Sequence, residues 1–428
     1  MITSKGDTIA QIYDDIMTEL RRRKIEDVDA YAPFFLVSYA CHVFNLINRE
    51  RHIYTFGGLV PNMRVPVLFM APPGCGKSYL LKHLTDEMYG IFATQGEHPI
   101  TLEQGLTEAG LIGTRRANTD GTTTPEPGAA YDNRTGFIVI DEFSAISAAM
   151  KAQYNSQLES QLLTALDSGN VRKRLATGRI EYHTDFTLWC GIQPIKCDLS
   201  GGLGRRMALL LNIPNRESRQ RYKNAAKYSD NITIDIPTLF NMRDQITMWC
   251  SSLGSIKKIT IDESLLEYLD HELDADSAIM DFYKRIIIGY HLIKYGASSL
   301  EIVVKPNDEL LNILETSHLW REQVTQGPEI QQIIEIISQN AELRGREYYI
   351  DKLTLNQYAG RMHLSASQLH AKLTDMHKYG YIKMNGDTIV MPEEAARDVR
   401  FADKLEGEDI TGYETYIDPD FTPDEVDI

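Results

Sequence analysis

A short apolar run that ends in a glycine-rich turn is the stretch of this sequence best suited to chemistry. Residues 65–70 are apolar and have the length of a buried strand. The next eight residues, 71–78, read Ala-Pro-Pro-Gly-Cys-Gly-Lys-Ser. They match the phosphate-binding pattern GxxxxGK[ST], with alanine in place of the first glycine. Glycines let successive backbone N–H groups point at one anion, and a helix that begins at Lys77 adds its positive end.

We expect this turn to bind ATP together with Mg²⁺. Lys77 would reach the β- and γ-phosphates, and the Ser78 hydroxyl would be a ligand of the metal ion. The alternative is a glycine-rich turn that carries a lysine by chance, and the strand before it and the helix after it argue against that. The predicted nucleotide-binding residues of the turn are Pro73, Gly74, Cys75, Gly76, Lys77, Ser78 and Tyr79.

A second apolar run, residues 137–140, ends in two carboxylates. A buried parallel strand delivers such acids to the carboxyl edge of its sheet, where ligands bind in open α/β folds. We expect Asp141 to support Mg²⁺ and Glu142 to polarise the attacking water. Together with the phosphate-binding turn, this pair predicts hydrolysis of ATP rather than storage of the nucleotide.

A third apolar run, residues 187–192, ends in an amide, Gln193, and a Gly-Arg-Arg-Met stretch follows it at 204–207. Gln193 could orient the water or sense the γ-phosphate. Arg205 or Arg206 could reach the γ-phosphate of a neighbouring subunit and stabilise charge in the transition state. The alternatives are an ordinary strand-end residue for Gln193 and a surface salt bridge for either arginine.

Between the second and third runs, residues 171–184 alternate about a Thr-Gly turn, which predicts a β-hairpin. Four of its residues are basic, and we expect Lys173, Arg174 and Arg179 to contact DNA phosphates. The alternative is a solvated edge strand that positive charge protects from pairing.

The sequence pattern divides the chain into segments and predicts an α/β fold, with a parallel sheet flanked by helices. A lid residue commonly contacts the phosphates, and we expect Arg285 to do so. The predicted segments are an N-terminal helical segment (1–50), the nucleotide-binding core (51–214), a helical lid (215–320), a winged helix (328–392) and an acidic, disordered tail (393–428).

The winged helix is predicted from a helix at 329–340, a second helix that Ser365 caps and Gly380 ends, and a hairpin at 381–391. Its second helix would face a major groove of DNA. The alternative is that this segment binds protein, because its charge is not strongly basic. The residues that we expect this helix to expose are Ser367, Gln368, His370 and Lys372.

The composition is that of a soluble globular chain, 43% hydrophobic and 24% charged over 428 residues. Its net charge of −16 excludes a polycation that coats DNA, but it does not exclude a local basic rim. The tail is acidic, and we expect it to bind a protein partner or to compete with DNA for a basic groove. The five cysteines show no CxxC pairing, so we predict a reducing, cytoplasmic compartment and no zinc site. No stretch resembles a signal peptide or a membrane span.

Taken together, the motifs of residues 50–300 resemble the AAA+ module of the minichromosome maintenance (MCM) replicative helicases. The family also has a winged helix after this module, a presensor hairpin with a DNA-contacting lysine, and a helix-2 insert, which Gly105-Leu106-Thr107 would begin. About fifty residues precede the module, fewer than the family's N-terminal oligonucleotide-fold domain needs. The matching positions are Phe56-Gly57-Gly58, Gly74, Lys77, Ser78, Ile140-Asp141-Glu142-Phe143, Gln193-Pro194 in place of Asn-Pro, and Arg205 in place of the arginine finger.

The resemblance implies a DNA helicase or translocase that acts in replication and assembles into a ring, with a hexamer as the expected form. Two alternatives stay open. One is a protein-remodelling ATPase of the MoxR or magnesium-chelatase kind, which shares the hairpin and the helix-2 insert. The other is a DNA-binding initiator or loader that ATP switches between assembly states.

Overall fold

The computed structural model describes most of the chain, and the observations below concern those residues. They are 12–103, 106–118, 122–151, 158–175, 178–194, 202–214, 216–227, 233–326, 328–359, 364–378 and 381–393. The predicted acidic tail lies outside the described residues, apart from its first residue, Glu393.

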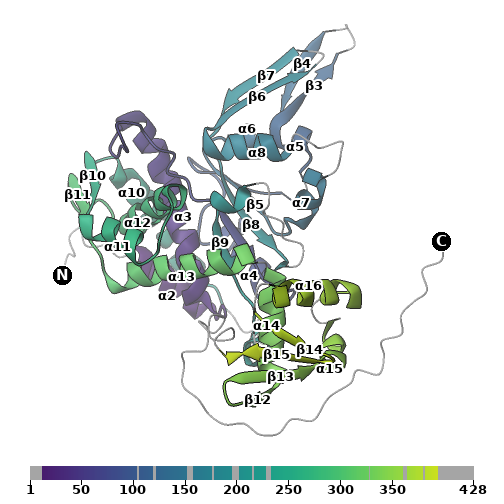
Figure 1. Ribbon diagram of the computed structural model, residues 1–428. Helices are drawn as coiled ribbons and strands as arrows, with labels where there is room; N and C mark the ends of the chain where they lie inside the picture. Colours follow the sequence, from purple (N-terminus) through teal and green to yellow (C-terminus); the bar gives the residue numbers. More distant parts are fainter. Residues whose placement is uncertain are drawn as a thin grey trace.

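A parallel sheet of five strands forms the centre of the molecule, in the order β2-β5-β8-β1-β9 (Figure 1). Every neighbouring pair is parallel. All strands except β2 are fully buried, which explains why they appear in the sequence as continuous apolar runs. The α/β class that the sequence predicts is therefore confirmed. The strands are β1 (Val67–Met70), β2 (Ile100–Leu102), β5 (Phe137–Ile140), β8 (Thr187–Ile192) and β9 (Ala208–Leu211).

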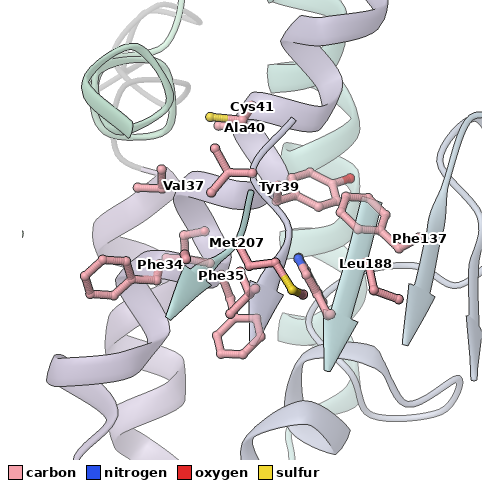
Figure 2. Packing of buried hydrophobic residues seen from close by; sticks show 14 of the residues in the cluster. Phe34, Phe35, Val37, Tyr39, Ala40, Cys41, Phe137, Leu188 and Met207 are labelled. Atoms are coloured by element: carbon pink, nitrogen blue, oxygen red, sulfur yellow. The ribbon is translucent and has the colours of Figure 1, made fainter. Parts of the chain in front are cut away.

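Helices flank this sheet on both sides, and the N-terminal pair supplies much of its covering. Two aromatic side chains of α3 pack on the sheet: Phe35 meets Trp189 edge to face, and Tyr39 stacks on Phe137 with ring centroids 5.4 Å apart (Figure 2). By length and composition α3 could cross a membrane, but most of it is buried in this core. The helices of the core are α2 (Ile12–Arg22), α3 (Val28–Arg51), α4 (Lys77–Thr85), α5 (Glu108–Ile112), α6 (Ala129–Asp132), α7 (Ser144–Lys151) and α8 (Leu158–Asp167).

Polar side chains on α3 join it to the sheet by buried hydrogen bonds. Trp189 donates from Nε1 to Ser38 Oγ at 2.8 Å, and Ser38 donates in turn to the Val65 carbonyl. His42 places Nδ1 2.9 Å from Thr187 Oγ1 and Nε2 2.9 Å from the Thr135 carbonyl. Buried polar groups need such partners, so these bonds fix the register of α3 against β8.

Burial lowers the pKa of His42 to about 3, which predicts a loss of stability in acid. The unfolded chain binds this proton near pH 6.5 and the folded chain resists it, so stability is lost as the pH falls from 6.5 towards 3. We expect His42 to remove about 2 kcal/mol between pH 7 and pH 5. Urea unfolding of the wild type and of His42→Gln at both pH values measures this. An equal pH dependence in the two proteins would contradict it.

The segment after the core is mainly but not wholly helical. Two strands, β10 (Lys258–Ile261) and β11 (Glu301–Val304), form a parallel pair within it, so the expectation that 215–320 is all-helical is wrong at these strands. Both strands are short and lie among strong helical patterns, which hides them in the sequence. The helices are α9 (Arg216–Lys227), α10 (Ile236–Leu253), α11 (Glu263–His271), α12 (Ser277–Tyr295) and α13 (Asp308–Gln326).

Two β-hairpins project together from the same end of the core (Figure 1). One is β3 (Gly113–Ala117) with β4 (Thr123–Pro127), within the stretch where the sequence predicts a helix-2 insert. The other is β6 (Asn170–Leu175) with β7 (Gly178–His183), which confirms the predicted basic hairpin. Arg115 joins them, because its Nη1 donates to the Arg179 carbonyl at 3.3 Å.

Residues 328–393 build a separate core of their own around a four-stranded sheet, in the order β12-β13-β15-β14. The predicted helices and final hairpin are present, and a further hairpin, β12–β13, turns at Gly345 with φ +67°. Ser365 caps α16 reciprocally with Gln368, whose side chain accepts from the Ser365 N–H at 2.9 Å. The elements are α14 (Pro328–Asn340), β12 (Glu342–Arg344), β13 (Glu347–Asp351), α15 (Lys352–Gln357), α16 (Ala366–Lys378), β14 (Lys383–Asn385) and β15 (Thr388–Pro392).

Candidate nucleotide site

The turn between β1 and α4 has the geometry of a phosphate-binding loop. Gly74 and Gly76 adopt φ +75° and φ +82°, a backbone region that other residues rarely enter. Lys77 is buried, and its ammonium donates to the carbonyls of Ala71 at 2.7 Å and Pro72 at 3.3 Å. The loop therefore folds around its own lysine, and α4 begins at that lysine, so the positive N-terminal end of the helix faces the loop.

Lys77 and Asp141 lie at the same edge of the same sheet, one strand apart. They follow β1 and β5, and β8 runs between these two strands. Gly191 on β8 shows how close they come. A Cβ added there would lie 2.4 Å from the Asp141 carbonyl oxygen and 3.7 Å from Lys77 Cδ. The single nucleotide site that the sequence predicts is therefore geometrically possible.

Glu142 and Gln193 are in direct contact beside this edge. Gln193 Nε2 lies 3.4 Å from Glu142 Oε2, and Ser144 donates its hydroxyl to the other carboxylate oxygen. The Phe143 N–H donates to the Gly191 carbonyl at 2.7 Å, which holds the turn after β5 against β8. The carboxylate and the amide can thus act on one water molecule together.

The residues present fit MgATP. Ser78 and Asp141 are exposed to solvent and offer the hard oxygen donors that Mg²⁺ prefers. The space over Gly74 is open, since a Cβ there would meet no atom within 4 Å. Pro73 is exposed as well, whereas Tyr79 is partly buried against His83, with ring centroids 4.4 Å apart.

The two arginines of the Gly-Arg-Arg-Met stretch differ in their contacts. Arg206 binds the Asp167 carboxylate and donates to the Gly202 carbonyl at 2.8 Å, and the bond to Asp167 raises its pKa. Arg205 ends the short 3-10 helix Leu203–Arg205 and is exposed. Its guanidinium has no hydrogen bond or ion pair with any residue that the structure describes. Of the two, only Arg205 is available to a second molecule.

The structure does not bring Arg285 to the phosphate loop. Arg285 pairs with Asp281 on its own helix, α12, and its Nη1 donates to the Arg64 carbonyl at 3.4 Å. Arg64 precedes β1, whereas the loop follows β1, so Arg285 lies towards the opposite edge of the sheet. The expectation of a phosphate contact from Arg285 does not agree with this placement.

Three residues that the sequence analysis missed lie beside the loop instead. Arg219 on α9 is close enough that its charge acts on the thiol of Cys75, whose pKa burial raises. Asn212 donates to the Cys75 carbonyl at 3.4 Å, and the ring of Tyr222 lies against Gly76. Residues 216–227, directly after the last core strand, are rich in arginine and lysine. That pattern could have indicated a phosphate-binding cation such as Arg219 in this segment.

The three predicted DNA contacts of the β6–β7 hairpin differ in exposure. Lys173 is one-tenth exposed and pairs with Glu108 at 3.2 Å, which places it in the hairpin's support rather than on its surface. Arg179 is half exposed and pairs with Glu181. Arg174 is exposed and has no ion pair with any described residue. Arg174 is therefore the most available cation of the three.

Comparison with known families identifies the core. The profile of the ATPase family associated with various cellular activities (AAA) matches residues 67–182, which span the phosphate loop, Asp141, Glu142 and the β6–β7 hairpin. A search of curated proteins found no match to the chain. The matched residues include both Lys77 and Asp141, which meet at the same edge of the sheet. This chain thus carries an AAA ATPase domain, which implies that it binds and hydrolyses ATP.

Proposed function

We propose that this chain is a DNA-stimulated motor ATPase of the MCM-like kind. It would assemble into a ring of identical subunits in the cytoplasm. The ring would act in DNA replication as a helicase or translocase. The observation that carries this proposal is the position of the two hairpins. Both hairpins project side by side from the same end of the ATPase core (Figure 1). A conformational change at the nucleotide site could therefore be transmitted to DNA bound by the hairpins.

In this account each residue at the sheet edge has one task. Lys77 and the loop amides would bind the phosphates, and Ser78 and Asp141 would hold Mg²⁺, which would supply positive charge against the phosphates. Glu142 takes a proton from the attacking water. The Gln193 amide, which contacts the Glu142 carboxylate, orients both that carboxylate and the water.

The nucleotide site would be completed by a second copy of the chain. Arg205 is exposed and unpaired among the described residues, whereas the other cation of the stretch is held by Asp167. A guanidinium supplied by a neighbour stabilises charge on the transferred phosphoryl group. Arg219, beside Cys75, is our replacement for Arg285 as the phosphate-contacting residue from the same chain.

DNA binding would involve the two hairpins and the exposed face of helix α16 in the winged helix. Arg174 and Arg179 on β6–β7 and Arg116 on β3–β4 are exposed. On α16, Ser367 and His370 are exposed, but Gln368 is engaged in the helix cap and Lys372 is partly buried. The hairpins are therefore the stronger of the two surfaces for contact with phosphates.

A protein-remodelling ATPase is the second candidate, and one observation favours it. Glu181 pairs with both Arg172 and Arg179, and Glu108 pairs with Lys173, so carboxylates offset much of the positive charge of the hairpin. A remodeller needs the hairpin but not its cations.

The ATPase rate with and without single-stranded DNA separates these candidates. We expect DNA to stimulate the wild type at low salt, where phosphate contacts are strongest. Arg174→Ala with Arg179→Ala should reduce this stimulation, and the slope of log affinity for single-stranded DNA against log salt should become shallower by about 1.4. The matched control removes two exposed cations of the lid, Lys257 and Lys258, and should keep the stimulation. No stimulation of the wild type by any DNA would refute the proposal.

A further inference from the structure

A chain of hydrogen bonds, buried except at its Asp27 end, connects the phosphate loop to α9 and to the residue that precedes α3. Asn212 follows β9 and is fixed there by its backbone N–H, which donates to the Met70 carbonyl at 2.8 Å. Its side-chain Nδ2 donates to the Cys75 carbonyl at 3.4 Å and to the Tyr222 hydroxyl at 2.7 Å. Tyr222 donates in turn to Asp27 Oδ2 at 2.8 Å. Both Asn212 and Tyr222 are less than one-tenth exposed.

The direction of every bond in this chain is fixed by its donors and acceptors. The Tyr222 hydroxyl has one proton and gives it to Asp27, so it must accept from Asn212. The two N–H groups of the Asn212 amide are then both used. Burial raises the pKa of Tyr222, so the hydroxyl keeps its proton. Arg221 Nη2 lies 3.2 Å from the other Asp27 oxygen and holds that carboxylate in place.

The consequence for the loop follows from the planarity of the peptide. The peptide between Cys75 and Gly76 is trans, so its C=O and N–H point in opposite directions. Because Asn212 holds the carbonyl, the Gly76 N–H is directed away from Asn212. The ring of Tyr222 lies against Gly76 itself, since a Cβ on Gly76 would lie 2.9 Å from Tyr222 Cε1.

We propose that Asn212 and Tyr222 are positioning residues for nucleotide binding, which orient the Cys75–Gly76 peptide so that the Gly76 N–H meets a phosphate. The inference rests on the ATPase assignment of the core. Asn212 and Tyr222 both lie outside the AAA match at 67–182, and the N-terminal Asp27 holds the Tyr222 hydroxyl in place. An N–H held in place before the anion arrives costs no rearrangement on binding, and this raises affinity rather than the rate of the chemical step.

The test measures binding of a fluorescent ATP analogue and steady-state ATP hydrolysis in the full-length chain. Tyr222→Phe keeps the ring against Gly76 and removes the hydroxyl, and we expect the Kd for ATP to rise about fivefold. Asn212→Ala should raise it about tenfold or more, because the carbonyl loses its donor. In both variants KM should rise with Kd while kcat stays within about twofold. The double variant should bind ATP no more weakly than Asn212→Ala alone, because both changes break the same chain of hydrogen bonds.

The matched control is Tyr268→Phe on α11, which removes a hydroxyl that donates to the Glu315 carboxylate at 2.7 Å. It should leave the Kd for ATP unchanged, and it shows what a lost tyrosine–carboxylate bond does through stability alone. Wild-type affinity in Tyr222→Phe and Asn212→Ala, or a fall in kcat without a change in Kd, would overturn the inference. A wild type that binds no ATP would instead overturn the ATPase assignment, and the inference with it.

Discussion

Replacement of Lys77 by alanine is expected to lower both ATP binding and hydrolysis by about 10²- to 10³-fold. The Lys77 ammonium is buried inside the loop, where it donates to the Ala71 and Pro72 carbonyls. Its removal takes away the charge that opposes the β- and γ-phosphates. Equilibrium binding of ATP and the rate of phosphate release measure the two losses separately.

The control for Lys77→Ala is Lys82→Ala on the same helix, whose side chain is exposed. It removes the same charge from α4, and we expect affinity and rate to change by less than about twofold. Unaltered ATP binding in Lys77→Ala would mean that the loop does not hold the triphosphate. The site at the edge of the sheet would then have to be abandoned.

Replacement of Glu142 by glutamine is expected to stop turnover while ATP binding persists. The amide keeps the size of the side chain but cannot accept a proton from water, and the loss of a positioned base costs about 10²- to 10⁴-fold in rate. Binding should persist because Glu142 lies beside Gln193 and Ser144, not among the loop amides. Phosphate release and equilibrium binding of ATP, measured on one preparation, test both halves of this result.

Ser144→Ala is the control for Glu142→Gln, because it removes a hydroxyl that donates to the same carboxylate. It should lower the rate only about tenfold or less, since the base itself remains. If Glu142→Gln turns over ATP at the wild-type rate, Glu142 is not the base.

The sheet and its catalytic edge were predictable because they rest on local signals. Each buried strand appears as an apolar run, and each functional group stands at the end of one, as Asp141 does after β5. Parallel pairing then brings those ends together without further information. The fold class and the association of Lys77 with Asp141 follow from these two facts.

The remaining contacts depend on tertiary packing, which a pattern in one segment does not encode. Tyr222 reaches the loop only because α9 turns back over it, and Asp27 is 195 residues away from Tyr222 in the chain. Arg285 shows the converse. The sequence predicts that Arg285 lies in a helical segment, but the direction in which α12 packs puts it by the Arg64 carbonyl. The exposure of Arg205 and the pairing of Arg206 likewise required the position of Asp167.

We propose that each nucleotide site is completed by two copies of this chain. The most direct test mixes two variants that should each be nearly inactive: Glu142→Gln, which retains Arg205, and Arg205→Ala, which retains Glu142. In a mixed assembly, an Arg205→Ala subunit gains the guanidinium of its neighbour and regains an intact site. We expect the rate of ATP hydrolysis by the mixture to exceed clearly the sum of the separate rates, and a rate equal to that sum would rule out a site shared between two subunits.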